Sequence, residues 1–243
     1  MLKKTFSHVE GVSNTTEKLL WENEIDSWET FLEKYEEINF LPKSKIEVIK
    51  TEIHFSIEHL RNNNIRYFKE KIVEKEHWRL KDHAKICYLD IETTGLSRWT
   101  DEITLIGIYD GYKQHLFVKG ENLEDASEFL KQFDIVVTFN GKMFDVPFME
   151  YKFNEKYDLV HLDLRFLLRE FGLKGGLKSI EKSLGIRRDE DVTDIDGREA
   201  VRLWRRYKTG DLNALELLKK YNKEDIVNLK TLLDYYVNRK TSL

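Results

Sequence analysis

The stretch "YLDIETTGL" (residues 88–96) places two acids, Asp90 and Glu92, at the end of an apolar run. Its apolar approach, "ICYL" (86–89), predicts a buried strand, and residues i and i+2 of a strand point to the same face. The two carboxylates are therefore expected side by side near the carboxyl end of this strand. Like charges at such a distance repel and are costly to bury, and a divalent cation such as Mg²⁺ or Mn²⁺ would remove that cost.

The alternative is an ordinary solvated pair of acids. The chain has 44 acids among 243 residues, so chance alone gives on the order of eight acid-x-acid pairs. A metal site needs further carboxylates from other elements. Asp145 follows a second apolar run, "DIVVTFN" (134–140), and Asp225 stands four residues after Tyr221, which puts both on one helical face. Singly, these residues read as a helix cap, a half-buried tyrosine and an exposed acid, so the site rests on the whole set.

The surrounding pattern predicts an α/β fold with a mixed β-sheet flanked by helices, preceded by a small helical region. Residues 1–84 read as helical and form the expected accessory region, and residues 85–243 form the main domain. After residue 166 the pattern is helical to the end. The expected strands are residues 85–92, 102–110, 113–119, 134–140 and 158–164, with a helix at 123–133. Three consecutive strands before the first helix indicate a sheet with an antiparallel start.

The composition limits the classes of function. The formal net charge of −4 excludes a polybasic binder, so any contact with nucleic acid must come from local patches. The single cysteine, Cys87, excludes a disulfide framework and favours a reducing, cytoplasmic location. No apolar run reaches the length of a membrane span or of a signal-peptide core, so no membrane partner is expected.

Taken together, the motifs resemble those of a known family. Asp90-x-Glu92 in "LDIETTGL", Asp145 after "FNG" and Tyr221-x-x-x-Asp225 resemble the three exonuclease motifs of the DEDD superfamily, in its tyrosine-bearing (DEDDy) branch. Lys220 stands where the histidine branch carries its histidine. With "EHWRL", "TFNGKMFD", "HLDL" and "YNKEDIVNL", the chain looks closest to the YprB-type ribonuclease H-like proteins, over about residues 84–240. The resemblance implies a ribonuclease H-like fold and metal-dependent 3′-to-5′ hydrolysis of phosphodiester bonds.

The resemblance also implies a role for each motif residue. Two divalent ions, Mg²⁺ or Mn²⁺, would hold the attacking and leaving oxygens. Asp90 would bridge both ions, and Glu92 and Asp225 would complete the site of the ion that activates water. Asp145 would support the second ion. Tyr221 would orient or deprotonate the attacking water, and orientation is the favoured role because an unperturbed tyrosine has a pKa near 10.

Residues near the motifs are candidates for contact with the substrate. Thr93, Gly95 and Leu96 form the turn expected to meet the terminal nucleotide, and Asn140 and Phe144 could line the same pocket. The alternatives for the last two are a strand end and a core aromatic. The expected substrate is a single-stranded 3′ end. DNA and RNA are both possible substrates, because no residue in the sequence indicates a contact to the 2′-hydroxyl.

Two further segments could contact nucleic acid or could be purely structural. Arg198, Arg202 and Arg205 share a helical face that could bind phosphates, although a solvated face paired with Glu199 is the simpler interpretation.

Residues 5–36 resemble a helix-hairpin-helix element, which would bind a nucleic-acid backbone. Gly11 fits its first hairpin glycine and Ser13 stands where the second is usual, so a purely structural cap stays open.

Three other functions remain open at this point. The first is a non-catalytic nucleic-acid-binding module on the same fold, against which the complete acid set argues. The second is a structure-specific endonuclease that uses the same metal ions. The third is an interaction subunit that binds a protein partner through its N-terminal helices.

Overall fold

The computed structural model describes residues 1–242 and divides into two compact units, Met1–Ala84 and the part from Lys85 onward. Each unit has its own core and is described by itself. Among the described residues, no helix has both the length and the apolar character required to cross a bilayer.

The first unit is helical throughout. Its α-helices are α1 (Asn14–Glu22), α2 (Trp28–Lys34), α3 (Lys43–Arg61) and α4 (Ile65–Lys71), and its 3-10 helices are η1 (Leu2–Lys4), η2 (Tyr35–Glu37) and η3 (Glu74–His83). Ser13 and Ser27 cap α1 and α2 through their side chains, as expected of serine before a helix. The core contains Trp28, Phe31 and Phe68, which are fully buried.

The second unit is built on one five-stranded sheet with the strand order β3-β2-β1-β4-β5. The strands are β1 (Ile86–Thr93), β2 (Ile103–Tyr109), β3 (Gln114–Val118), β4 (Ile135–Thr138) and β5 (Val160–Asp163). The first three strands pair antiparallel, and β1–β4 and β4–β5 pair parallel. The predicted mixed sheet with an antiparallel start is confirmed, and it has the ribonuclease H-like arrangement.

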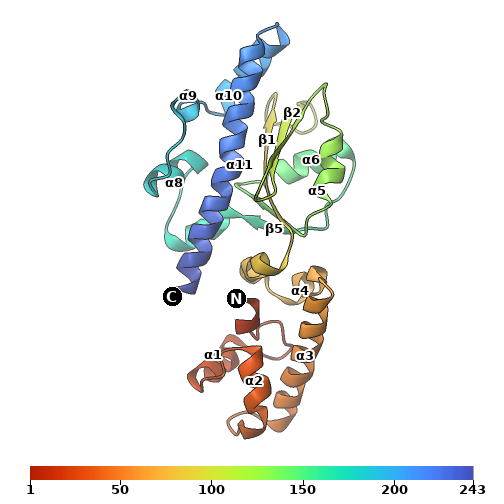
Figure 1. Cartoon of the computed structure of the whole chain (residues 1–243), viewed down its shortest axis with the longest axis vertical. Helices are drawn as coiled ribbons and strands as arrows, with labels where there is room; N and C mark the ends of the chain where they lie inside the picture. Colours follow the sequence, from red (N-terminus) through yellow and green to blue (C-terminus); the bar gives the residue numbers. More distant parts are fainter. Residues whose placement is uncertain (243) are drawn as a thin grey trace. The chain divides into compact units, whose positions relative to one another are not determined.

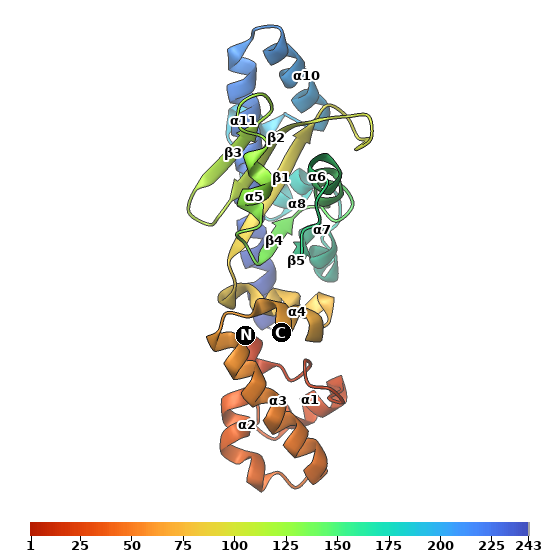
Figure 2. The same cartoon turned by 90° about the vertical axis from the view of Figure 1, so that its right-hand side faces the viewer.

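Helices cover both faces of this sheet (Figures 1 and 2). On one face, α5 (Asp125–Leu130) and α6 (Asp145–Phe153) pack on apolar residues of β1 and β2 such as Leu89 and Ile106. On the other face, α10 (Gly197–Lys208) and the long α11 (Leu212–Thr241) pack on Leu105 and Val118. The remaining helices of this unit are α7 (Leu164–Leu167), η4 (Leu168–Phe171), α8 (Leu177–Ser183) and α9 (Glu190–Thr193).

The observed boundaries differ from the predicted ones where a turn residue intervenes. Strand β4 ends at Thr138, two residues before the predicted end, because Asn140 adopts a positive φ of 69° and begins a turn. Helix α5 is shorter than the predicted 123–133, and Lys131 is its C-cap.

Candidate metal centre

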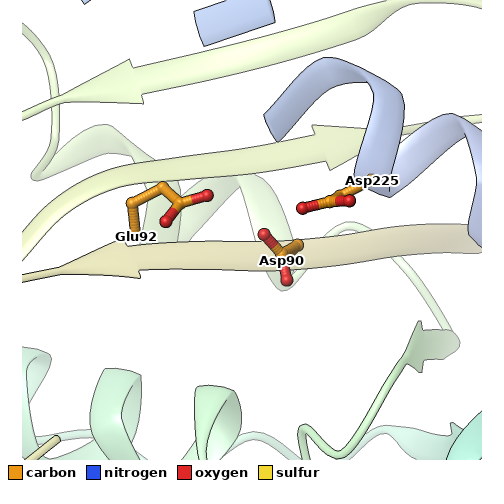
Figure 3. A group of neighbouring side chains, drawn as sticks. All are labelled: Asp90, Glu92 and Asp225. Carbon is orange, nitrogen blue, oxygen red and sulfur yellow. The ribbon is translucent and has the colours of Figure 1, made fainter. Parts of the chain in front are cut away.

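The alternation of β1 explains why its two acids face the same helix. Cys87, Leu89 and Ile91 belong to the core under α5 and α6. The residues between them point to the opposite face, so Asp90 and Glu92 project together toward α11. Figure 3 shows both side chains on β1 and Asp225 reaching them from α11.

Three carboxylates meet at this point. One oxygen each from Asp90, Glu92 and Asp225 lies within 4.8 Å of the other two. Glu92 and Asp225 are buried and Asp90 is half-buried. An all-oxygen, acidic donor set of this kind suits a hard cation such as Mg²⁺ or Mn²⁺ better than a softer metal. The residues present therefore fit the metal that the sequence predicts.

The fourth predicted ligand, Asp145, is held beside this cluster. It is buried in the first turn of α6, and its Oδ1 accepts a hydrogen bond of 3.1 Å from the backbone N–H of Ile91. Strand β4 pairs with β1 only as far as Tyr88, so it does not reach this N–H. Asp145 adds to the negative field at Asp90 but is not one of the three carboxylates that converge within 4.8 Å.

Burial of several acids together makes their charged forms costly. The pKa values of Asp90 and Glu92 lie well above the usual range because both groups are desolvated and because Asp225 and Asp145 are negative neighbours. Burial raises the pKa of Asp145 to about 7 and that of Asp225 to about 6. A cation bound here would favour the ionised form of all four groups.

Arg188 is a charged partner of the cluster that the sequence reasoning missed. Its side chain is only 4% exposed and forms two hydrogen bonds with Glu181, of 2.6 and 2.8 Å, and a third with Asp225. The guanidinium opposes the rise in the pKa of Asp225. Arg188 lies 37 residues before Asp225 in the sequence, and no local pattern links the two.

Tyr221 lies one helical turn before Asp225, as predicted. It is 9% exposed, with the ammonium group of Lys178 and the guanidinium of Arg188 at 5.2 and 5.7 Å from its ring centroid. Burial and the three nearby carboxylates raise its pKa, which excludes a phenolate at neutral pH. By contrast, Lys220 pairs with Asp189 and Asp191 at the surface.

A cavity of about 460 Å³ adjoins the carboxylates. This volume is within the range of small-molecule sites. Its wall contains four of the five predicted substrate contacts, Thr93, Gly95, Leu96 and Phe144, together with Glu92. The other side is formed by the start of α10, where the lining residues are Asp196, Gly197, Arg198 and Val201. Of these four, the sequence had indicated only Arg198, as a possible contact to phosphate.

Asn140 is the predicted substrate contact that the structure does not bring to this cavity. Its backbone N–H donates to Asp163 Oδ1 at 2.8 Å, and its side-chain oxygen accepts from Arg165 at 2.6 Å. Asp163 also accepts from the backbone of Lys142. These contacts fix the turn after β4 and leave the Asn140 side chain engaged within the protein.

The loop from β1 to β2 is pinned close to the cavity. Asp101 accepts hydrogen bonds from the backbone of Ser97 at 2.9 Å and from the hydroxyl of Thr94 at 3.3 Å. A Cβ atom on Gly95 would lie 2.5 Å from the Asp101 carboxylate, so a side chain at this position would displace the carboxylate from these hydrogen bonds. The loop presents two exposed apolar side chains, Leu96 at 87% and Trp99 at 66% exposure.

The arginine stripe on α10 divides between its two interpretations. Arg202 pairs with Glu199 at 2.9 Å, as expected for a solvated face. Arg198 instead lines the cavity, and no carboxylate of residues 1–242 lies within 4 Å of its guanidinium. The helical face that was predicted to be solvated therefore contributes one basic residue, Arg198, to the candidate site.

Comparison with solved structures gives matches of low identity. The family B DNA polymerase of Pyrobaculum calidifontis matches with 15% identity and a TM-score of 0.49, over 64% of this chain and 24% of the polymerase. Brucella melitensis NrnC bound to pGG matches with 18% identity and a TM-score of 0.45, over 65% of this chain and 75% of NrnC. The same NrnC with bound Mg²⁺ matches with 18% identity and a TM-score of 0.43, over 65% of this chain and 75% of NrnC.

Sequence comparison identifies the family. A search of curated proteins found no significant match. The model of the RNase_H superfamily matches residues 87–237, which contain the whole sheet apart from its first residue, all four acids and nearly all of α11. This match covers more than half of the chain, and the chain therefore belongs to the RNase_H superfamily.

Proposed function

We propose that this protein is a metal-dependent 3′-to-5′ exonuclease that hydrolyses phosphodiester bonds at single-stranded ends of DNA or RNA. The observation that carries the proposal is the convergence of Asp90, Glu92 and Asp225 within 4.8 Å, beside a cavity whose wall includes Glu92. Ionised carboxylates at this distance repel each other, and a cationic ligand would offset this repulsion.

In this proposal Asp90, Glu92, Asp145 and Asp225 hold two divalent ions, Mg²⁺ or Mn²⁺. Bound ions would supply the positive charge that polarises the phosphodiester and lowers the pKa of water. Tyr221, which is buried one helical turn before Asp225, orients the attacking water as a hydrogen-bonding group. Arg188 holds the Asp225 carboxylate in place.

The tyrosine-bearing DEDDy branch, and the YprB-type group within it, are part of the proposal. Tyr221 is buried against the acid cluster, whereas Lys220 forms ion pairs with surface acids. The tyrosine that defines the DEDDy branch therefore lies at the proposed metal centre. Lys220, at the position of the histidine in the other branch, pairs with acids away from this centre.

A single-stranded substrate is favoured by the surroundings of the cavity. Exposed Leu96 and Trp99 offer apolar and aromatic surface on which unpaired bases can stack. The Arg98 guanidinium lies 4.7 Å from the ring centroid of Trp99 and brings positive charge to the same loop. A chain with a net charge of −4 lacks the general basic character that favours long duplexes.

A cleavage assay tests the proposal. Oligonucleotides of DNA and of RNA, labelled at the 5′ end, are incubated with Mg²⁺, Mn²⁺ or EDTA. The wild type is compared with Asp90→Asn and with Glu216→Gln, which removes an exposed acid on α11 outside the cluster. We expect a metal-dependent ladder that shortens from the 3′ end for the wild type and Glu216→Gln, and no ladder for Asp90→Asn.

Other outcomes select other functions. Cleavage of a circular single strand would identify an endonuclease. Binding of oligonucleotides without any cleavage, at every metal concentration, would identify a non-catalytic module and overturn the proposal.

The role of the N-terminal unit stays a prediction. Gly11 has a positive φ of 77°, which favours glycine, and Ser13 caps α1 by accepting a hydrogen bond from the backbone of Thr16. We propose that this unit contributes contacts to nucleic acid or to a protein partner. Loss of oligonucleotide affinity in Gly11→Val, at unchanged kcat, would support the first of these roles.

A further inference from the structure

Asn222 is a buried polar residue whose contacts lead to the acid cluster. It follows Tyr221 on α11 and has no exposed surface. Its side-chain Nδ2 donates hydrogen bonds to Asp90 twice, at 2.9 Å to the carboxylate Oδ2 and at 3.3 Å to the backbone oxygen. The amide therefore fixes both the side chain and the main chain of Asp90.

The sheet is shaped to admit this amide. Gly107 on β2 pairs directly with Asp90 on β1. A Cβ atom on Gly107 would lie 1.8 Å from Asn222 Oδ1 and 2.9 Å from Asn222 Cγ, so any side chain at this position would displace the Asn222 amide. Glycine weakens a strand interior, and it is found where another group approaches the backbone closely.

The other end of the amide makes no hydrogen bond. Asn222 Oδ1 is buried and has no hydrogen-bond partner among residues 1–242. An unpaired buried oxygen opposes folding. Stability alone therefore does not explain an asparagine here, and the explanation lies in what its N–H groups hold.

We propose that Asn222 is a positioning residue for the metal centre, which holds the Asp90 carboxylate in the orientation that ligates a divalent cation, and that Gly107 provides the space for it. The inference rests on the metal centre of the proposed function but not on nuclease activity. An amide is suited to this task because it donates a hydrogen bond without adding positive charge next to the cation. Partners of this kind orient carboxylate ligands in metal sites and raise their affinity for the metal.

Binding of Mn²⁺ to the metal-free protein, followed by electron paramagnetic resonance without substrate, tests the inference. The dissociation constant is compared for the wild type, Asn222→Ala, Gly107→Ala and the double variant. Asn213→Ala is the matched control, because Asn213 is exposed on the same helix. Melting temperatures and far-ultraviolet circular dichroism of each metal-free variant report on folding.

We expect Asn222→Ala to weaken Mn²⁺ binding by roughly 10–100-fold, the usual cost of losing an outer partner of a metal ligand. Gly107→Ala should also weaken binding, because its methyl group displaces Asn222. The double variant should bind Mn²⁺ no more weakly than Asn222→Ala alone, since the two residues act through one contact. Asn213→Ala should match the wild type.

Either of two results would overturn the inference. One is unchanged Mn²⁺ affinity in a single variant that folds, and Gly107→Ala alone provides this test if Asn222→Ala folds poorly. The other, where both single variants and the double variant fold, is additive losses in the double variant, which would show that Gly107 acts separately from Asn222. A wild type that binds Mn²⁺ with the expected variant pattern but cleaves nothing would leave the inference intact and refute the exonuclease. A wild type that binds no Mn²⁺ would refute both.

Discussion

At the scale of single residues, the centre combines repelling acids with a few fixed donors. The carboxylates of Asp90, Asp145 and Asp225 each accept a hydrogen bond, from Asn222, the backbone of Ile91 and Arg188 respectively. A hydrogen bond to one oxygen of each carboxylate thereby fixes its orientation. This preorganisation reduces the cost of assembling the site around a cation.

Asp225→Asn should nearly abolish metal binding and cleavage. The loss in kcat should exceed the roughly 10–100-fold that removal of an outer partner costs, because a direct ligand is lost. Isothermal titration with Mn²⁺ and the cleavage assay measure the two effects, with Glu216→Gln on the same helix as control. Wild-type affinity for Mn²⁺ in Asp225→Asn would show that Asp225 is not a ligand.

Arg188→Met should destabilise the protein, because it leaves Glu181 and Asp225 as buried acids without their counter-charge. The expected loss in the free energy of unfolding is about 3–5 kcal/mol, as for other broken buried ion pairs. Urea unfolding measures it. The double variant Arg188→Met/Glu181→Met should recover part of this loss, and a double variant as unstable as the single one would refute the explanation.

At the scale of elements, the alternation in "YLDIETTGL" was enough to predict that Asp90 and Glu92 share one face of β1. It was also enough to predict that Tyr221 and Asp225 share a helical face, because strand and helix periods are local properties. The pairing of Asp90 with Gly107 and the contact of Arg188 with Asp225 were not predictable. Both depend on how distant elements pack, and neither has a local signature.

The neighbouring residue Asn222 had a weaker signal that the sequence reasoning missed. It stands three residues before Asp225 on α11, a spacing that places both on adjacent parts of one face. Nothing in the sequence, however, shows that Gly107 leaves room for its amide. The contribution of α10 to the cavity was likewise not predictable, because it depends on packing between residues about 100 positions apart in the sequence.

Trp99→Ala in the β1–β2 loop should weaken binding of single-stranded oligonucleotides. Base stacking on an aromatic side chain contributes about 1–3 kcal/mol, which corresponds to roughly 5–150-fold in Kd. Fluorescence anisotropy with a labelled oligonucleotide in EDTA measures binding without cleavage. Tyr112→Ala is the control, because Tyr112 is 94% exposed in the turn between β2 and β3. Equal losses in both variants would argue against a specific stacking site.

At the scale of the whole molecule, the buried acids link stability to pH. The folded-state pKa of Asp145 is about 7, against an unfolded value of 3.8, so the metal-free folded state binds more protons than the unfolded state between these values. The contribution of Asp145 to stability therefore falls as the pH rises from about 4 to about 7. Asp225, with a pKa of about 6, acts in the same direction.

Asp145→Asn should remove part of this pH dependence. In EDTA its melting temperature should equal that of the wild type near pH 4 and exceed it near pH 8, since the buried charge is absent. Mg²⁺ should raise the melting temperature of the wild type near pH 8, because a cation that binds only the folded state stabilises it. Scanning calorimetry across this range measures both, and parallel profiles for the two proteins would contradict the linkage.

The most direct test of the central claim, that Asp90, Glu92 and Asp225 form a divalent metal site, is anomalous diffraction from crystals grown with Mn²⁺. We predict an anomalous peak bounded by these three carboxylates, and no such peak in crystals of Asp90→Asn grown under the same conditions. Wild-type crystals that show an anomalous peak only at another place, or no peak among these carboxylates, would contradict the account.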